Sequence, residues 1–228
     1  MEKDFSIIEK RIGVVFKNKD LIKQAFVHKS YINENRDFPL SHNERLEFLG
    51  DAVLELVVTE YLYRNFPNPE GELTNWRSAL VKGESLSKEA KRLGFNEFLY
   101  LSRGESKGSE RARNIILANC FEAVIGAIYE DQGYENAKKF IDKNIIVKLD
   151  KILENSLHVD PKSRFQELTQ EKIGATPRYD VLEEDGPDHN KHFVVGVFVN
   201  GEEYGRGEGS SKQQAAINAA ENALKKGF

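Results

Sequence analysis

The most informative stretch of the chain is His42-Asn43-Glu44-Arg45-Leu46-Glu47-Phe48-Leu49-Gly50-Asp51-Ala52-Val53-Leu54. At about 100° per residue, Glu44, Glu47 and Asp51 fall on one narrow face of a helix. Like charges one turn apart repel, and burial raises that cost, so we expect a cation to compensate them. Apolar side chains cover much of the remaining circumference and predict a buried helix: Leu46, Leu49, Val53, Leu56 and Val57.

A solvated helix face is the ordinary explanation of a run of charges, but the apolar flanks and the small Gly50 argue against it here. Glu55 continues the acidic stripe one turn further. It could equally mark the point where the face reaches solvent, so it is left out of the predicted site.

A second helix, over residues 115–129, is apolar nearly all round, which is typical of a core helix. Its strongly polar side chains are Asn119 and Glu122, which share one face, and Gly126 one turn further would admit a close helix neighbour. A buried carboxylate should be neutralised, paired or bound to a metal. The alternative to a metal is a salt bridge between Glu122 and one of three arginines: Arg77, Arg111 or Arg113.

If these two faces meet, they form an oxygen-rich cluster without His or Cys. Hard oxygen ligands, with water in the remaining positions, suit Mg²⁺ or Mn²⁺ rather than Zn²⁺. Such sites commonly hold phosphate esters and activate water for in-line attack. The chemistry alone therefore predicts a divalent-metal phosphodiesterase or phosphohydrolase, with no organic cofactor.

Outward from this centre, residues 1–155 have the apolar periodicity of helices. The helix near 41–65 is predicted to begin at Ser41, with Glu44 completing a capping box. The predicted helices lie near 4–11, 19–28, 41–65, 72–82, 84–93, 109–131 and 134–154.

A linker is predicted at residues 156–160, and a different pattern fills residues 161–228. A helix from Pro161 to about Lys172 precedes three strand-like runs, and Asn200-Gly201 is a strong two-residue hairpin signal. The predicted strands are Arg178–Glu184, Lys191–Val199 and Glu203–Gly209, and the final helix runs from about Ser211 to Lys226. The order α-β-β-β-α predicts a small α+β domain after an all-α domain.

Composition narrows the class further. In 228 residues, 39% apolar and 31% charged side chains describe a soluble globular protein rather than a disordered or collagen-like one. The single Cys120 excludes an internal disulfide and favours a reducing, cytoplasmic location. No signal peptide is visible, and no window of about 18 uninterrupted apolar residues suggests a membrane span.

The net charge of −4 argues against a protein that binds polyanions over its whole surface. Residues 158–228 hold 9 Lys and Arg against 12 Asp and Glu. Any affinity for nucleic acid must therefore come from local placement of cations and from recognition of shape.

The segment from Asn43 to Leu54 resembles the signature of the ribonuclease III family. Residues 26–31 (Phe-Val-His-Lys-Ser-Tyr) and 116–123 (Ile-Leu-Ala-Asn-Cys-Phe-Glu-Ala) support the resemblance, and residues 161–228 are similar to a double-stranded RNA-binding domain. The resemblance implies a homodimer in which each subunit contributes one metal cluster to a shared RNA valley. It further implies Mg²⁺-dependent hydrolysis of double-stranded RNA, with 5′-phosphate and 3′-hydroxyl ends and two-nucleotide 3′ overhangs, for processing of ribosomal and other RNA precursors.

Motif positions carry the family roles onto this chain. Glu47, Asp51 and Glu122 would bind metal and act in catalysis, Glu44 would be an accessory acid near the scissile phosphate, and Phe48 would lie at the dimer interface. Asn119 departs from the pattern, because many members have Asp there. An amide oxygen can still ligate Mg²⁺ but brings no charge.

Asn119 is either a natural variant with weaker metal affinity or an inactivating substitution, and the intact acidic positions favour the first. The alternative function is a double-stranded RNA-binding protein with weakened or absent cleavage. A phosphohydrolase for smaller substrates fits the second domain poorly.

The resemblance also implies three RNA contact regions in residues 161–228, each of which could instead be ordinary surface. They are Gln166, Glu167 and Gln170 on the first helix, His189 in the loop of residues 186–191, and Ser210, Ser211 and Lys212 at the start of the last helix. The helix start attracts phosphate through its backbone N–H groups and dipole.

Overall fold

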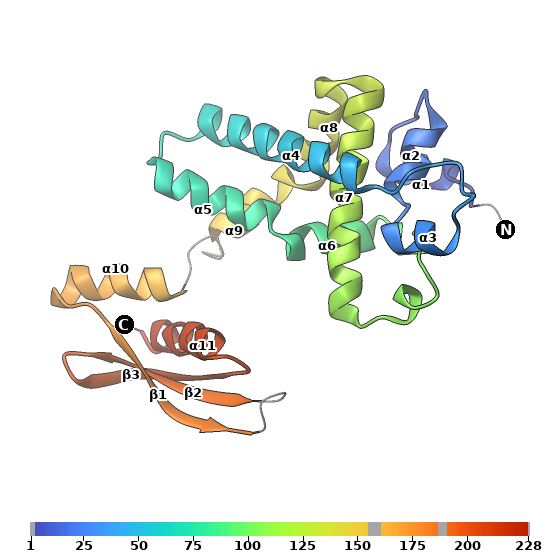
Figure 1. The fold of residues 1–228 in the computed structure, drawn as a ribbon. Helices are drawn as coiled ribbons and strands as arrows, with labels where there is room; N and C mark the ends of the chain where they lie inside the picture. The colour runs from blue at the N-terminus through green and yellow to red at the C-terminus, as the bar shows by residue number, and fades with distance from the viewer. Residues whose placement is uncertain (1–2, 155–160, 187–190, 228) are drawn as a thin grey trace. The chain divides into compact units, whose positions relative to one another are not determined.

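The chain divides into two compact units, Met1–His158 and Val159–Phe228. The computed structural model describes residues 3–154, 161–186 and 191–227 (Figure 1). The first unit is helical, and the second has the order α-β-β-β-α, which confirms the predicted fold class. The predicted linker at residues 156–160 lies outside the described residues, so the domain boundary there stays a prediction.

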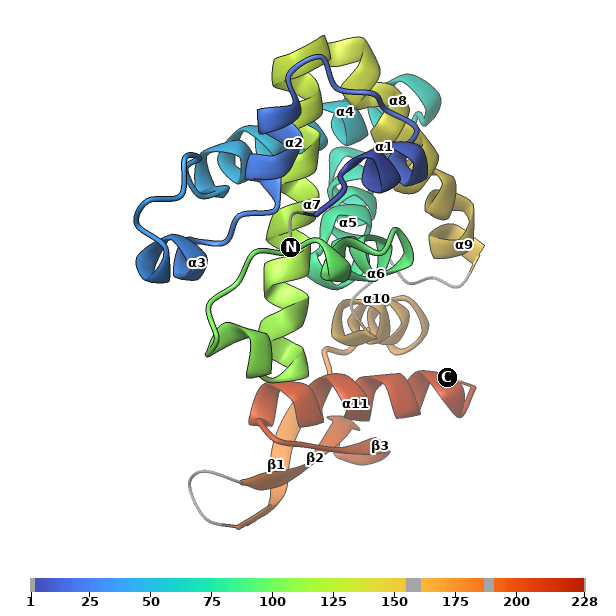
Figure 2. The ribbon, with the colours of Figure 1, turned by 90° about the vertical axis from the view of Figure 1, so that its right-hand side faces the viewer.

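The first unit packs its helices around one apolar core (Figure 2). Short 3₁₀ segments connect several of them. The helices are α1 (Ser6–Ile12), α2 (Lys19–Ala25), α3 (Lys29–Glu34), α4 (Glu44–Asn65), α5 (Glu70–Val81), α6 (Gly83–Arg92), α7 (Glu110–Gln132), α8 (Tyr134–Asn144) and α9 (Leu149–Glu154), with 3₁₀ turns η1 (Phe95–Glu97), η2 (Glu105–Lys107) and η3 (Ile146–Lys148).

The start of α4 corrects one prediction. The helix begins at Glu44 with Asn43 in the capping position, so the capping box at Ser41 is wrong. Asn43 is fixed instead by tertiary contacts: its backbone N–H donates to Val27 O at 2.9 Å, and its side-chain amide donates to Ala25 O at 3.1 Å. These bonds hold residue 43 against the end of α2 and the chain just after it, and residues 41–42 are not helical.

The helices α4 and α7 cross in direct backbone contact (Figure 1). A Cβ atom at Gly50 would lie 1.8 Å from Glu122 O, and one at Gly126 would lie 2.1 Å from Leu46 O. Both distances are far below van der Waals contact, so only glycine allows this approach. The crossing brings the acidic face of α4 against the polar face of α7, which is the meeting on which the predicted site depends.

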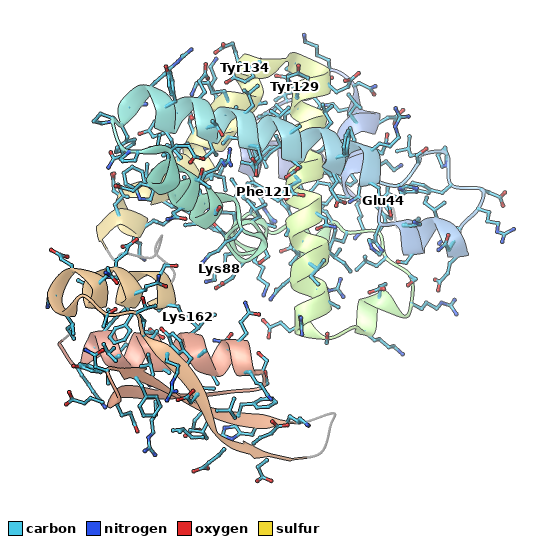
Figure 3. All side chains as sticks on the ribbon, turned by 60° about the vertical axis from the view of Figure 1, so that its left-hand side comes forward. Glu44, Lys88, Phe121, Tyr129, Tyr134 and Lys162 are labelled. Atoms are coloured by element: carbon cyan, nitrogen blue, oxygen red, sulfur yellow. The ribbon has the colours of Figure 1, made fainter. Side chains whose placement is uncertain are left out.

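The apolar helix α7 forms the centre of the first unit. Within the described residues, it is the one helix with the length and hydropathy to cross a membrane, but 61% of that stretch is buried inside the protein. Phe121, labelled in Figure 3, is fully buried on it. Burial against other helices is the signature of a core helix, which is what the sequence predicted.

The second unit is an antiparallel sheet in the order β1-β2-β3, with both helices on one face (Figure 2). Asn200 and Gly201 have φ angles of +51° and +87°, the values of the predicted two-residue hairpin. Phe193, Val195 and Val197, at alternate positions on β2, are buried. The elements are α10 (Pro161–Ile173), β1 (Arg178–Asp185), β2 (His192–Val199), β3 (Glu202–Gly209) and α11 (Lys212–Lys225).

Candidate functional site

The acidic face of α4 is only partly buried. Glu44, at the exposed start of the helix (Figure 3), lies 3.2 Å from Lys29 Nζ and 3.7 Å from His42 Nδ1. Glu47 is half-buried, whereas Asp51 is exposed. A cation of the kind expected from the sequence is therefore present at Glu44.

The electrostatics show that α4 and α7 bring their acids together. Burial raises the pKa of Glu122 to about 7, and the negative charges of Asp51 and Glu47 add to the shift. Burial also raises the pKa of Glu47, and Glu44 contributes to that shift. A hydrogen bond with the Asn119 side chain acts in the opposite direction on Glu47. Five side chains, three from α4 and two from α7, thus share one electrostatic environment.

The salt-bridge alternative for Glu122 is wrong. Arg77 donates to Thr59 Oγ1 at 3.1 Å and lies 3.6 Å from Glu55. Arg113 donates to two backbone carbonyls of η2, and Arg111 is exposed. Across the parts of the chain that the structure describes, no cation pairs with Glu122. Within these described parts, its negative charge consequently has no cationic partner.

The donor set fits a hard divalent cation in chemistry, since it offers carboxylate and amide oxygens and no soft ligand. Among the described residues, however, no three Asp, Glu, His or Cys side chains converge closely enough to surround an ion. The backbones of α4 and α7 already touch at Gly50. The predicted carboxylate ligands therefore lie at one helix contact without forming a coordination shell.

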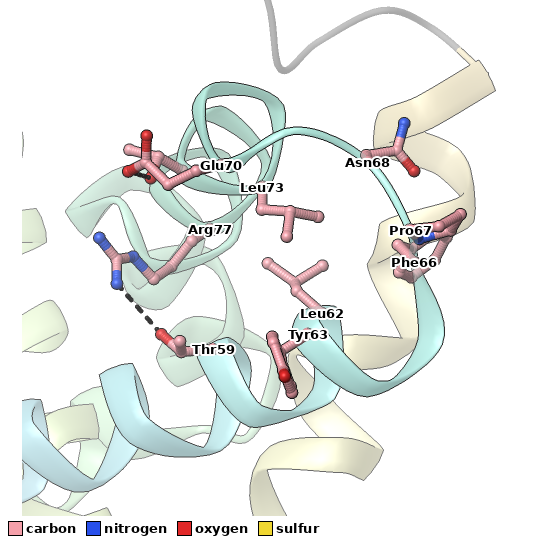
Figure 4. Close-up of a pocket in the computed structure, with 10 residues that line it drawn as sticks. Thr59, Leu62, Tyr63, Phe66, Pro67, Asn68, Glu70, Leu73 and Arg77 are labelled. Carbon is pink, nitrogen blue, oxygen red and sulfur yellow. Dashed lines mark hydrogen bonds between the residues drawn. The ribbon is translucent and has the colours of Figure 1, made fainter.

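One face of α4 is more exposed than the sequence predicted. Phe48 is 81% exposed, Tyr63 is 79% exposed, and Leu56, expected among the buried apolar positions, is 57% exposed. These three residues form the exposed apolar stripe of α4. Beside Tyr63, a cavity of about 650 Å³ opens between the end of α4 and the start of α5, and Arg77 bonds Thr59 at its edge (Figure 4).

The predicted RNA contacts of the second unit lie on its surface. Gln166, Glu167 and Gln170 are exposed on α10 and line an open hollow. Ser210 is exposed, and Ser211 is committed to capping α11, because its side chain accepts a hydrogen bond from Gln214 N at 3.1 Å. His189 lies outside the described residues.

The remaining predicted contact, Lys212, already has a partner. Its Nζ lies 3.1 Å from Glu184 Oε2, and the same Nζ lies 5.4 Å from the ring centre of Phe193.

Comparison with known proteins assigns both units. Residues 18–149 match the model of the family described as ribonuclease-III-like. Residues 161–226 match the double-stranded RNA binding motif. The chain belongs to the ribonuclease III family. It is accordingly an endoribonuclease that carries its own double-stranded RNA-binding domain.

Relatives in the ribonuclease III family match nearly the whole chain. Ribonuclease 3 of Enterococcus faecalis is 46% identical over 219 residues, which are 96% of this chain and 95% of that one. Ribonuclease 3 of a Geobacillus strain is 47% identical, over 97% of this chain and 90% of that one.

A solved relative covers the first unit. It is the nuclease domain of ribonuclease III from Campylobacter jejuni, described for structural flexibility in the region involved in its dimer formation. It is 39% identical, with a TM-score of 0.56, and the match covers 62% of this chain and 98% of that one.

Sequence reasoning missed the polar partners of the predicted site residues. Lys29 and His42 flank Glu44, and the short helix α3 that begins at Lys29 was not predicted. The Phe26–Tyr31 motif contains Lys29 and was the available signal. No sequence pattern indicated that Glu184 would pair with Lys212, because Glu184 lies 28 positions earlier in an ordinary acidic run.

Proposed function

We propose that this ribonuclease III family member hydrolyses phosphodiester bonds of double-stranded RNA with Mg²⁺ held between α4 and α7. The products would be 5′-phosphate and 3′-hydroxyl ends with two-nucleotide 3′ overhangs, in the processing of ribosomal and other RNA precursors in the cytoplasm. The observation that carries the proposal is the raised pKa of Glu122, about 7, at a helix contact where no described cation balances it. A divalent cation would supply the missing charge.

Glu47, Asp51, Asn119 and Glu122 would hold the ion, with Mn²⁺ as a substitute. When bound, such an ion lowers the pKa of its water and neutralises charge on the phosphate. Glu122 is half-buried, and burial is the largest cause of its raised pKa. Glu44, exposed and paired with Lys29, would act as the accessory acid beside the scissile phosphate.

Asn119 has a second task besides ligation. Its side chain hydrogen-bonds Glu47 and favours the charged form of that carboxylate. This contact supports a natural variant in which an amide orients a neighbouring ligand. The chain would then keep its chemistry with lower metal affinity than a family member that has Asp at this position.

Homodimerisation is proposed through the exposed apolar stripe of α4, of which Phe48 is the most exposed member. An aromatic side chain 81% exposed on a folded surface favours a partner, and its burial would stabilise the dimer by about 2 kcal/mol. Replacing Phe48 with Asp should convert the protein to a monomer in sedimentation experiments. Asp at Val15, which is 73% exposed outside the stripe, is the matched control and should leave the assembly unchanged.

RNA would be recognised by shape through the exposed faces of α10 and the start of α11. Gln166 and Gln170 suit minor-groove 2′-hydroxyls, and Lys212 suits a phosphate at the positive end of α11. The loop with His189 is proposed as the remaining contact.

The test is cleavage of a long RNA duplex in the presence of Mg²⁺. Staggered products that vanish with Glu122→Gln support the proposal, and an RNA duplex that stays intact at every Mg²⁺ concentration contradicts it. Binding without cleavage, with cleavage restored by Asn119→Asp, would instead establish the second candidate, a binding protein impaired by Asn119. Anomalous density for Mn²⁺ among the four ligands would test the metal assignment directly.

A further inference from the structure

In the second unit, the carboxylate of Glu184 lies between two lysines. Its Oε1 accepts a hydrogen bond from Lys191 Nζ at 2.7 Å, and its Oε2 lies 3.1 Å from Lys212 Nζ. Glu184 lies near the end of β1, Lys191 directly precedes β2, and Lys212 is the first residue of α11. Residues Glu184, Lys191 and Lys212 are called here the Glu184 cluster.

In the Glu184 cluster, Glu184 pairs with a lysine that is proposed to bind RNA. Lys212 is the lysine assigned above to a phosphate, and a carboxylate oxygen and a phosphate oxygen are alternative acceptors for the same ammonium. We propose that Glu184 competes with RNA phosphate for Lys191 and Lys212, and thereby lowers the affinity of the protein for duplex RNA. This inference rests on the proposed function, because it presupposes that Lys212 faces RNA.

The ion pairs of the Glu184 cluster are exposed, so they can exchange for a phosphate without loss of the fold. The side chains of Glu184, Lys191 and Lys212 are 37%, 35% and 61% exposed. Ion pairs at such exposure contribute about 0–1 kcal/mol, so an approaching phosphate can displace the carboxylate. The apolar clusters that hold the second unit together, around Phe165 and Phe193, do not include Glu184.

Loss of Glu184 should free Lys212 without disordering it. The Lys212 ammonium lies 5.4 Å from the centre of the Phe193 ring, and this cation–π contact places it independently of the carboxylate. Removing one negative charge from two lysines raises the charge of the cluster from +1 to +2. In a region with 9 basic and 12 acidic residues, that single charge is a large fraction of the available attraction.

The consequence for the reaction is easier release of product. Differences in affinity among variants of one interface are expressed mainly in dissociation rates. A carboxylate that returns to the lysines as phosphate leaves would shorten the residence of cleaved duplex. Glu184 is therefore a positioning and affinity-setting residue, not a catalytic one.

The experiment measures binding of the full chain to an RNA duplex of about 20 base pairs, in a chelator so that no cleavage occurs. Glu184→Gln should lower Kd about two- to fivefold and slow dissociation to match. It should also steepen the dependence of log K on log salt by up to about one. Glu183→Gln is the matched control, since it removes the same charge one residue away and Glu183 pairs with neither lysine.

A gain with Glu184→Gln that exceeds the control, and that disappears in a Lys191→Ala/Lys212→Ala background, supports the proposal. Equal effects of the two glutamine variants, or weaker binding by Glu184→Gln, overturn it while leaving the RNA surface intact. Unchanged binding by Lys212→Ala would overturn the assignment of Lys212 itself, and the inference with it. Thermal melts followed by circular dichroism confirm that each variant is folded.

Discussion

Two carboxylates in this protein show opposite electrostatic behaviour. Glu122, on α7, is partly buried close to other acids, and its pKa rises to about 7. Glu184, at the end of β1, lies against Lys191 and Lys212, and its pKa falls below the ordinary value of a glutamate. The first carboxylate lacks a cation, and the second has two.

The contrast illustrates two ways in which charged side chains can make a protein ready to bind a phosphate ester. At the α4–α7 contact, uncompensated negative charge is held where a divalent cation can relieve it. In the Glu184 cluster, positive charge is held by a weak internal anion until a phosphate replaces that anion. In the proposed function, the first unit takes up a cation for the reaction, and the second unit keeps its lysines available for RNA. Substitutions that remove a single charge should therefore act in opposite directions in the two units.

The largest expected effect is at Glu122. Glu122→Gln keeps the size of the side chain but removes an anionic ligand, so cleavage of duplex RNA should fall by more than the roughly 10- to 100-fold that changes around a metal's ligands cost. Binding should stay within about twofold of the unmodified protein, because the side chain keeps its size and most of the assigned RNA contacts lie in the second unit. Multiple-turnover cleavage and chelator-based binding measure the two separately.

Glu84→Gln is the control for this loss. Glu84 lies on the same unit but forms an exposed pair with Lys88, 2.6 Å away, so its removal should leave cleavage unchanged. If cleavage survives Glu122→Gln, then Glu122 is not part of the metal centre. The contrast between Glu122 and Glu184 would then fail for Glu122.

A gain of charge at Asn119 should have the next largest effect. Asn119→Asp adds a fourth carboxylate where Glu47 and Glu122 already lack a cation. The concentration of Mg²⁺ that gives half-maximal cleavage should fall about tenfold, since affinity for hard cations rises with ligand charge. A Mg²⁺ titration of the cleavage rate measures this. An unchanged midpoint would show that residue 119 does not ligate the ion, and would leave its hydrogen bond to Glu47 as its only role.

The stability of the metal-free protein should depend on the ionisation of Glu122. A folded-state pKa near 7, above the unfolded value of 4.5, means that the stabilising protonated form is fully present below about pH 4.5 and is lost as pH rises through 7. From pH 5 to pH 8 in chelator, the Tm of the unmodified protein should therefore fall relative to Glu122→Gln, by roughly 2–6 °C.

Added Mg²⁺ should reverse that fall at pH 8, because the ion binds the ionised carboxylates of the folded state. Parallel Tm curves for the two proteins across this pH range would mean that Glu122 is solvated and not electrostatically strained.

Local chemistry made much of this structure predictable. Asn200 and Gly201 adopt the positive φ angles that their hairpin demands, and Gly50 and Gly126 mark the point where α4 and α7 touch. Both features depend on the conformational freedom or small size of residues at one position, which a sequence displays directly.

Tertiary contacts account for the failures. Ser41 was expected to cap α4, but Asn43 is tied to Ala25 and Val27 by bonds that no periodicity reveals. Leu56 has the spacing of a core residue and yet lies in the exposed apolar stripe, because hydrophobic spacing does not distinguish a core from an unpartnered face. The partners of Glu184 are likewise set by the sheet, which places residues from three separate elements together.

The smallest expected effect is a shift in the pKa of the Glu184 carboxylate, which tests the role given to Glu184 in the comparison. In an NMR titration of the full chain, the Glu184 carboxylate should titrate below the ordinary value of 4.5, since hydrogen bonds from Lys191 and Lys212 favour its charged form. Lys191→Ala should raise that pKa more than Lys212→Ala does, because Lys191 makes the larger contribution. Saturating RNA should shift it in the same direction as the alanine variants, since phosphate draws the ammonium groups away and adds negative charge. A Glu184 pKa that does not respond to RNA would mean that carboxylate and phosphate do not share these lysines, and the two units would then not differ in the way proposed.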